Sequence, residues 1–169
     1  MIYTLTMEEV AAAHQWVSEK LRIKATHDIR DKKFDRTNTS QGVSLIGIMG
    51  EIAGCRALNT QPNLEVMIGG DDGFDCVAYG LTWQIKTSSL RALIFNTADD
   101  FTADAALLVR HLAQKHDVPD DPRFHIIGGI SRKRFLRECG EHDYGYGMRL
   151  VMAADKVTPL EILLRVVGA

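Results

Sequence analysis

The sequence predicts a protein of the mixed α/β class, more narrowly an α+β protein with one mixed sheet and helices on its faces. Helical patterns dominate the first third of the chain, whereas the remainder alternates short apolar strand patterns with two short helical ones. With 169 residues the chain is long enough for one domain with a substantial core and too short for two. We therefore expect a single domain over 1–169, with an N-terminal helix and charged segment at 1–42 and the core at 43–169.

Two helices are expected first. A capping-box pattern at 6–9 opens an amphipathic helix that continues to about Lys24. Residues 25–41 are polar and charged without a clear period, which indicates a loop. The segment 43–58 is apolar on most sides and predicts a largely buried helix, which the polar residues at 59–63 end.

Short strands and two further helices are expected after residue 63. The predicted strands lie at 64–68, 92–95, 105–109, 124–130 and 148–153, and a hairpin occupies 71–88. Ser131 is placed to cap a short helix, and Thr158 followed by Pro159 opens a C-terminal helix that ends near Val167. This order of elements favours one mixed sheet with helices on its faces.

Charge and cysteine content limit the function classes. The formal net charge of −2 argues against a protein that coats nucleic acid by charge alone, although it leaves room for a local basic surface. The three cysteines form no C-x-x-C pair, so Cys55 and Cys76 are interpreted as buried thiols. Their odd, sparse count favours a reducing, cytoplasmic location. The first residues lack the basic start of a signal peptide, and no apolar run approaches the length of a membrane span.

The hairpin over 71–88 carries the most chemical information. With Tyr79 and Gly80 at the turn, Asp75 lies opposite Gln84. Because faces alternate along a strand, one face is apolar and contains Phe74, Cys76, Ala78, Leu81, Trp83 and Ile85. The other face contains Asp75, Val77, Thr82, Gln84 and Lys86. A carboxylate, an amide oxygen and an ammonium group are therefore predicted to converge.

This group of side chains suits metal-dependent phosphodiester hydrolysis. Such hydrolysis needs a divalent ion that activates water and stabilises the charge developing on phosphate. Mg²⁺ prefers oxygen ligands and keeps several waters, so Asp75 and Gln84 would suffice as protein ligands. Lys86 would orient the attacking water or offset charge in the transition state. Taken singly, Gln84 and Lys86 also fit the solvent-exposed face of an edge hairpin.

Glu51 is a further candidate for this site. It lies within an otherwise apolar helical segment, and a buried carboxylate needs a cation or a cavity beside it. Glycines at 47, 50 and 54 surround it, and each weakens a helix by about 1 kcal/mol. We expect either a sheet strand or a sugar–phosphate backbone to pack closely against that face. A salt bridge from Glu51 to Arg56 or a lysine is the alternative.

The order of these features resembles the PD-(D/E)XK nuclease superfamily. A glutamate in a glycine-bordered helix is followed by Asp-Asp-Gly-Phe-Asp at 71–75 and then by Gln-Ile-Lys at 84–86. The match is closest to the glutamine variant of Mrr-type restriction endonucleases, in which Gly-Asp-Gly-x-Asp precedes Gln-x-Lys. It covers roughly 47–88, and no proline precedes Asp75.

The resemblance implies an α-β-β-β-α-β core and cleavage of DNA with Mg²⁺, for which Mn²⁺ would substitute. On matching positions, it implies that Asp75 and Gln84 bind the metal, that Lys86 is catalytic and that Glu51 adds a helix carboxylate at the metal. Gln84 in place of an acidic residue removes one charge from that site. The alternative function is a catalytically inactive nuclease-fold protein that binds nucleic acid or a protein partner, and RNA remains open as a substrate.

Contacts to DNA are expected at two places beside the site. They are assigned to Ser88, Arg91, Ser131, Arg132, Lys133 and Arg134. Ser131 and the amides of the helix that follows would hold a phosphate, and a solvated charged surface is the alternative. Because so small a chain has little room for a specificity domain, we expect recognition of DNA shape or a homodimer that makes two cuts. The histidines are expected to have surface or structural roles.

Overall fold

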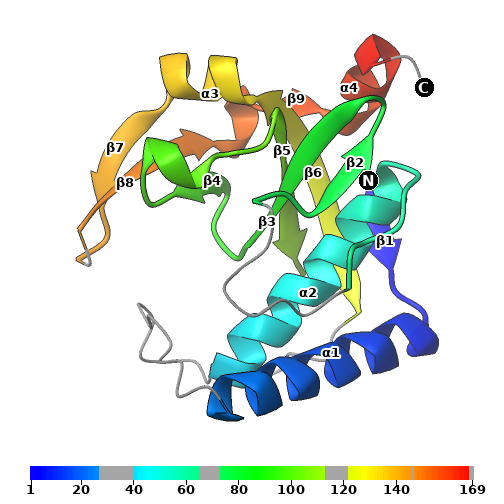
Figure 1. Cartoon of the computed structure of the whole chain (residues 1–169). Coiled ribbons are helices and arrows are strands. Elements are labelled where there is room, and N and C mark those ends of the chain that lie inside the picture. The colour runs from blue at the N-terminus through cyan, green and yellow to red at the C-terminus, as the bar shows by residue number, and fades with distance from the viewer. Residues whose placement is uncertain (27–39, 65–72, 113–121, 146, 168–169) are drawn as a thin grey trace.

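The structure is a computed structural model that describes residues 1–26, 40–64, 73–112, 122–145 and 147–167 (Figure 1). Its helices are α1 (Met7–Thr26), α2 (Ser40–Ala57), α3 (Arg132–Glu138) and α4 (Leu160–Val167), with short 3₁₀ turns η1 (Ala98–Asp100) and η2 (Ala154–Lys156). Its strands are β1 (Ile2–Thr4), β2 (Cys76–Ala78), β3 (Leu81–Ser88), β4 (Ala92–Phe95), β5 (Ala105–His111), β6 (Arg123–Ser131), β7 (Gly140–Asp143), β8 (Met148–Ala153) and β9 (Thr158–Pro159). The fold is therefore of the predicted mixed α+β class.

The strands form two sheets, whereas the sequence predicted one. The larger sheet has the order β1-β6-β5-β3-β2, with β9 also paired to β6. Only β3 and β5 are parallel neighbours among the described pairs of this sheet. Parallel neighbours need a crossover connection, and β4 and η1 provide it here. Because β4 pairs with β8 and β8 with β7, these strands form a second, antiparallel sheet.

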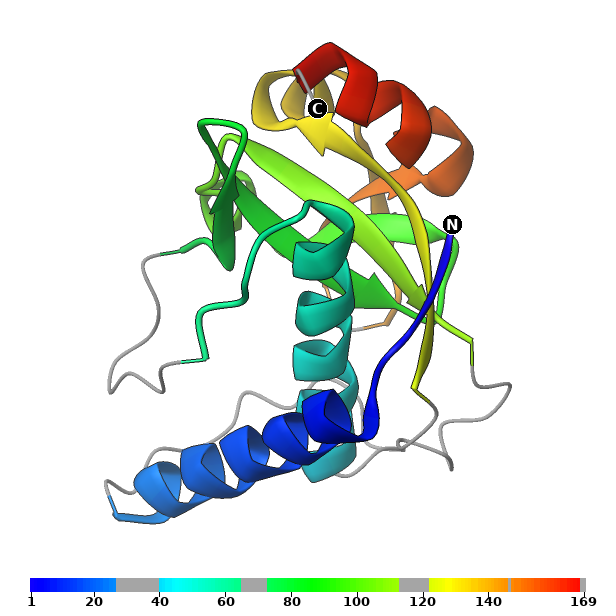
Figure 2. The ribbon, with the colours of Figure 1, turned by 90° about the vertical axis from the view of Figure 1, so that its right-hand side faces the viewer.

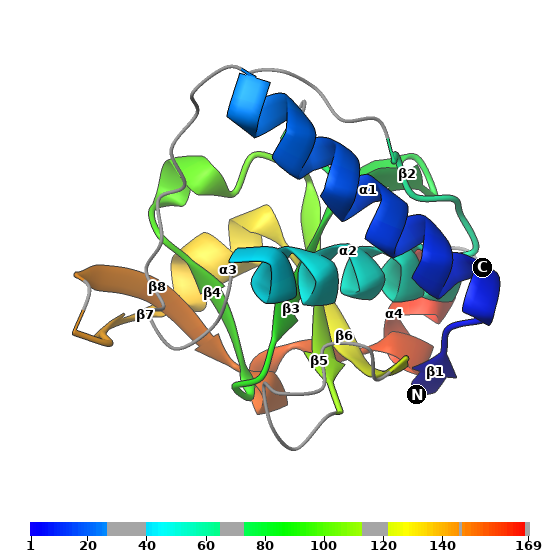
Figure 3. The ribbon, with the colours of Figure 1, turned by 90° about the horizontal axis from the view of Figure 1, so that it is seen from below.

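Helices and the smaller sheet cover opposite faces of the larger sheet. On one face, α1, α2 and α4 pack over side chains that include Trp83, Ile85 and Leu107. On the other face, β4, β8 and α3 pack over Ala106 and Leu108. Figure 2 shows α2 upright against the sheet with α1 across its lower end, and Figure 3 shows β7 and β8 projecting on the side opposite β1. Neighbours along β5 thus serve two different cores, as the alternation of strand faces requires.

Glycines allow α2 to approach β3 closely. A Cβ atom placed on Gly50 would lie 1.9 Å from the hydroxyl oxygen of Thr87, and one on Gly54 would lie 2.8 Å from the side chain of Ile85. Gly47, by contrast, has no such neighbour within 4 Å. A sheet strand or a sugar–phosphate backbone was expected to pack against this helix. The structure has the strand β3 there.

The start of α1 confirms the predicted capping box. The Glu9 carboxylate accepts a hydrogen bond from the Thr6 N–H at 2.7 Å, and the Thr6 hydroxyl accepts one from the Glu9 N–H at 3.2 Å. Glu9 also pairs with Arg56 of α2 at 2.9 Å, which ties the two helices together.

The start of α4 differs from the prediction. Thr158 and Pro159 do not open the helix; they pair with Gly129 and Gly128 as β9, and α4 begins at Leu160. The reason is the contact with β6, since a Cβ atom on Gly128 would lie 2.1 Å from the Thr158 carbonyl oxygen. The two adjacent glycines of β6 therefore admit a strand that the local helix signal did not predict.

Parts of the predicted nuclease core lie outside the described residues. They include Asp71, Asp72 and, apart from Leu64, the strand predicted at 64–68. Between β3 and β5 the chain has β4 and η1 instead of an α-helix. The α-β-β-β-α-β core therefore stays a prediction. Within the described part of the chain, no helix is both long and apolar enough to cross a membrane.

Candidate active-site pocket

The predicted hairpin is present, and the three residue pairs nearest its turn have the predicted register. The ladder pairs Cys76 with Trp83, Val77 with Thr82 and Ala78 with Leu81. Tyr79 and Gly80 form the two-residue turn, with φ of 52° and 72°. Positive φ at both positions is what a type I′ turn requires, and it matches the twist of the flanking strands. The turn therefore fixes which side chains of β3 share a face.

Asp75 departs from this ladder by one residue. Its backbone N–H donates to the Trp83 carbonyl at 2.8 Å, so the prediction that Asp75 lies directly opposite Gln84 is wrong. Its carboxylate accepts a hydrogen bond from the N–H of Ile85. A shift of this kind is typical of a β-bulge and redirects the preceding chain. Phe74 accordingly packs against the core beneath the smaller sheet, so the prediction that it joins the apolar hairpin face is wrong.

Asp75, Gln84 and Lys86 nevertheless line one pocket of about 410 Å³. Gln84 and Lys86 project from the face of β3 opposite α2, toward β4 and η1. The other residues that line the pocket are Gly73, Ile94, Phe95, Asn96, Asp99, Asp100 and Thr102. The Lys86 ammonium lies 5.3 Å from the centre of the Phe95 ring, within the range of a cation–π contact.

Gln84 is buried, and both ends of its amide are held. Its Nε2 donates to the Asp100 carbonyl at 3.0 Å, and its Oε1 accepts from the Thr102 N–H at 3.1 Å. The residue is only 7% exposed, so it does not belong to a solvated edge face. An amide oxygen has two lone pairs, and the bond from Thr102 uses one of them. The second lone pair can serve a cation.

The segment 96–102 forms a wall of the pocket that the sequence did not predict. The Thr102 hydroxyl donates to the Gly73 carbonyl, which ties this wall to the residues just before Asp75. Asp100 accepts hydrogen bonds from the N–H and hydroxyl of Thr97 and so closes η1. The adjacent acidic residues at 99 and 100, a few residues after the strand predicted at 92–95, were the signal that could have identified this wall.

Glu51 is not among the described residues that line the pocket. It lies on α2, which packs against the face of β3 opposite Lys86. The negative charges of Glu51 and Asp75 both affect the pKa of the buried Cys55 thiol. The pKa of Cys55 is raised by its hydrogen bond with Cys76, by burial and by nearby negative charge, including both carboxylates. The two carboxylates therefore approach one thiol, while Asp75 is the one that reaches the pocket.

The oxygen atoms of the pocket suit a hard cation. Carboxylate groups of Asp75 and Asp99 and the amide oxygen of Gln84 are the ligand types that Mg²⁺ prefers. The described residues contain no group of three or more His, Cys, Asp or Glu side chains placed to hold an ion. Mg²⁺ commonly keeps several waters and uses one or two carboxylates. The pocket therefore fits a largely hydrated ion better than one enclosed by protein ligands.

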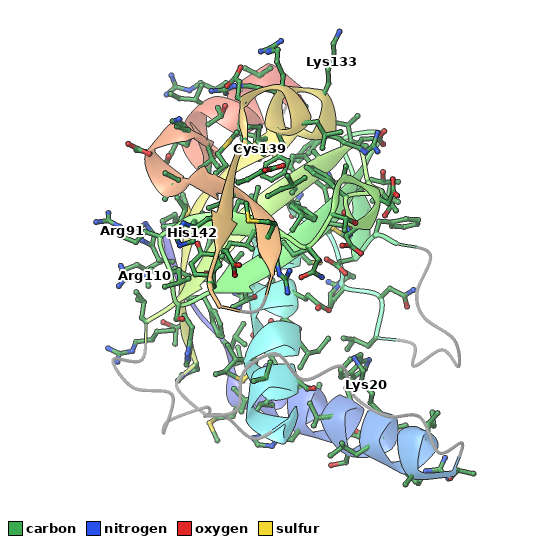
Figure 4. All side chains as sticks on the ribbon, turned by 90° about the vertical axis from the view of Figure 1, so that its left-hand side faces the viewer. Lys20, Arg91, Arg110, Lys133, Cys139 and His142 are labelled. Carbon is green, nitrogen blue, oxygen red and sulfur yellow. The ribbon has the colours of Figure 1, made fainter. Side chains whose placement is uncertain are left out.

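The basic residues of α3 are mostly engaged within the protein. Ser131 caps α3 as predicted, with its hydroxyl accepting from the Arg134 N–H at 3.3 Å. Arg134 pairs with Glu138 at 2.9 Å, and Arg132 donates to a backbone carbonyl of the 96–102 wall. Lys133 is exposed and points away from the protein (Figure 4). Of these four predicted DNA contacts, Lys133 is therefore the side chain best placed to meet a ligand.

Ser88 and Arg91 lie just beyond the Lys86 end of β3. The Ser88 hydroxyl accepts from the Leu90 N–H at 3.0 Å and so shapes the turn into β4. Arg91 is exposed. This pair therefore contributes one positively charged side chain to the surface.

Comparison of the chain with protein-family models, with curated proteins and with solved structures finds no match. The fold and pocket alone therefore define the class: a mixed α+β protein with a polar pocket between a β-hairpin and the β4–η1 crossover. Any more specific function has to rest on the chemistry of that pocket.

Proposed function

We propose that the chain is a metal-dependent endonuclease that hydrolyses phosphodiester bonds in DNA. The observation that carries the proposal is that Asp75, Gln84 and Lys86 line the same pocket. A carboxylate, an amide oxygen and an ammonium group around one space match the needs of this reaction, which develops negative charge on phosphate. The resemblance to the PD-(D/E)XK superfamily supports the same assignment.

Each of the three side chains has its own task in the proposed reaction. Lys86 supplies positive charge where the phosphate becomes more negative, and the Phe95 ring beside its ammonium limits where that charge can lie. Asp75 attracts a cation, and its bond from the Ile85 N–H fixes its carboxylate relative to β3. Gln84 adds a neutral oxygen whose direction η1 and Thr102 set.

Mg²⁺ or Mn²⁺ between Asp75 and Gln84 would supply an activated water and offset charge on the phosphate. One carboxylate and one amide oxygen attract a cation only weakly, so an added phosphate oxygen from DNA should strengthen binding. We therefore expect Mg²⁺ to bind more tightly when an uncleavable duplex is present. Calorimetry measures this, and equal Mg²⁺ affinities with and without the duplex would contradict it.

A plasmid-cleavage assay tests the proposed activity. We expect nicking or linearisation with Mg²⁺ or Mn²⁺, none in EDTA, and loss of activity in Asp75→Ala. Asp155→Ala is the matched control, because Asp155 is an exposed aspartate of η2 outside the pocket. Equal activity in wild type and Asp75→Ala would refute the site. If the wild type cleaves neither DNA nor RNA with either metal, the proposed hydrolysis is refuted.

A non-catalytic nuclease-fold protein is the second candidate. It is favoured by the neutral Gln84 and by the fact that the described residues hold no cluster of three metal-ligating side chains. Such a protein would bind nucleic acid or a protein partner through the same surface. Duplex binding in EDTA, followed by no cleavage when Mg²⁺ or Mn²⁺ is added, would favour this candidate.

A homodimer is part of the proposal, because two copies present two pockets for two strand cuts. Light scattering with and without DNA tests it. A monomer under both conditions would contradict the dimer without affecting the assignment of the pocket.

A further inference from the structure

A group of basic side chains lies at one edge of the molecule, outside the pocket. Arg110 of β5 pairs directly with His125 of β6, so the two share a face of the larger sheet. Arg91 lies in the connection between β3 and β4. Its positive charge, like that of Arg110, lowers the pKa of His125. Figure 4 shows Arg91 and Arg110 on the same flank of the protein, both pointing outward and well apart from Lys133. None of the three basic residues is among those that line the pocket.

Arg91 and Arg110 lack the carboxylate partners that several other arginines have in the described part of the chain. Arginines elsewhere pair with glutamates at 2.7 to 2.9 Å, namely Arg22, Arg56 and Arg134. Arg91 makes no such pair, and Nε of Arg110 is buried without a hydrogen-bond partner. An anion held by both arginines would offset their positive charge and accept hydrogen bonds from their outward-pointing guanidinium groups.

His125 experiences the same excess of positive charge. Its pKa is lowered first by burial and then by the amino group of Met1, by Arg110 and by Arg91, whereas Glu161 of α4 raises it. Cations from three parts of the chain thus act on one imidazole, against one carboxylate. This environment favours the neutral imidazole, and an arriving negative charge would favour its protonated form.

We propose that Arg91, Arg110 and His125 form a phosphate-binding site separate from the pocket. Guanidinium groups match the geometry of phosphate oxygens and bind them through paired N–H donors. Inorganic phosphate and the phosphates of a nucleic-acid backbone share this chemistry. The site does not depend on the proposed hydrolysis, because its residues lie outside the pocket and bind without a metal.

Binding in EDTA tests the site without interference from metal-dependent cleavage. The probes are inorganic phosphate, followed by calorimetry, and a short fluorescent DNA duplex, followed by anisotropy. We expect Arg91→Ala to weaken binding about tenfold, because a hydrogen bond to a charged group is lost. Arg110→Lys should weaken it several-fold, since lysine keeps the charge but loses the paired donors. Circular dichroism establishes that both variants are folded.

Arg22→Ala is the matched control, because it removes the same charge from the exposed surface of α1. It should leave binding unchanged. Binding of phosphate alone would support a small phosphate-bearing ligand, and binding of the duplex would support a backbone contact. Equal affinities of wild type, Arg91→Ala and Arg110→Lys for both probes would overturn the site. Equal weakening by Arg22→Ala and Arg91→Ala would also overturn it, as a diffuse charge effect.

The pH dependence of duplex binding tests the part assigned to His125. The duplex is the right probe because its phosphodiesters keep a constant charge near neutral pH. Since bound phosphate favours the imidazolium, wild-type affinity should rise several-fold between about pH 7.5 and about pH 5.5. His125→Gln should flatten this rise, while affinity at the higher pH changes little. An unchanged pH profile in His125→Gln would exclude His125 from the site.

Discussion

The side-chain amide of Gln84 donates a 3.0 Å hydrogen bond to the backbone carbonyl of Asp100. Its oxygen accepts from the N–H of Thr102, so the amide has one fixed orientation. An ionised glutamate at this position would have no proton to donate. Glutamine at position 84 therefore holds the η1 wall in place and adds no negative charge to the pocket.

The substitution Gln84→Glu should destabilise the metal-free protein by about 1–3 kcal/mol, because a buried donor is replaced by a second acceptor facing Asp100. It should also increase the rise in melting temperature on adding Mg²⁺, since a ligand that binds only the folded state stabilises it. Gln61→Glu makes the same chemical change at an exposed position and should do neither. Equal Mg²⁺ effects in Gln84→Glu and wild type would count against Gln84 as a ligand.

Two glycines of α2 should respond in opposite ways when each is replaced by alanine. Gly50→Ala should destabilise the protein by about 1–3 kcal/mol, because its Cβ would collide with Thr87 of β3. Gly47→Ala, which meets nothing within 4 Å, should be neutral or stabilising by up to about 1 kcal/mol. Urea unfolding of both variants measures the difference, and equal destabilisation would contradict the described packing.

Asp104 links acid stability to the hairpin. Its carboxylate accepts from the N–H and hydroxyl of Thr82, and these bonds lower its pKa. Because the folded pKa is below the unfolded value of about 3.9, this stabilisation is present above that value and is lost as pH falls through the folded pKa. Asp104→Asn should therefore lower stability near neutral pH and reduce its loss in acid. A loss of stability in acid as steep as that of the wild type would contradict this, and Asp155→Asn serves as the control.

The hairpin was predictable because its determinants are local. Alternating apolar residues and the Tyr79–Gly80 turn define its register, and the glycines of α2 indicate a close neighbour. The position of Asp75 was not predictable in the same way, because its carboxylate takes the N–H of Ile85 and shifts the chain by one residue. The register and the close neighbour of α2 thus follow from sequence patterns, whereas the position of Asp75 depends on one side-chain bond to the facing strand.

The second sheet and the 96–102 wall depend on distant partners. The segment Ala92–Phe95 was predicted as a strand with the observed bounds, but its pairing with Met148–Ala153 joins parts of the chain more than fifty residues apart. The turn η1, which follows this strand, contacts Gln84 through the Asp100 carbonyl and lines the pocket. Glu51 was predicted at the metal from its neighbours in the sequence, whereas the face on which α2 packs leaves it outside the pocket lining.

Plasmid cleavage by Lys86→Ala tests the central claim most directly. Lys86 reaches the pocket from β3, whereas Lys156 is an exposed lysine of η2 and provides the matched control. With Mg²⁺ present, we expect Lys156→Ala to cleave at the wild-type rate and Lys86→Ala to lose at least about 100-fold, as for other groups that stabilise transition-state charge. Cleavage by Lys86→Ala at the wild-type rate would contradict the account of the pocket as an active site.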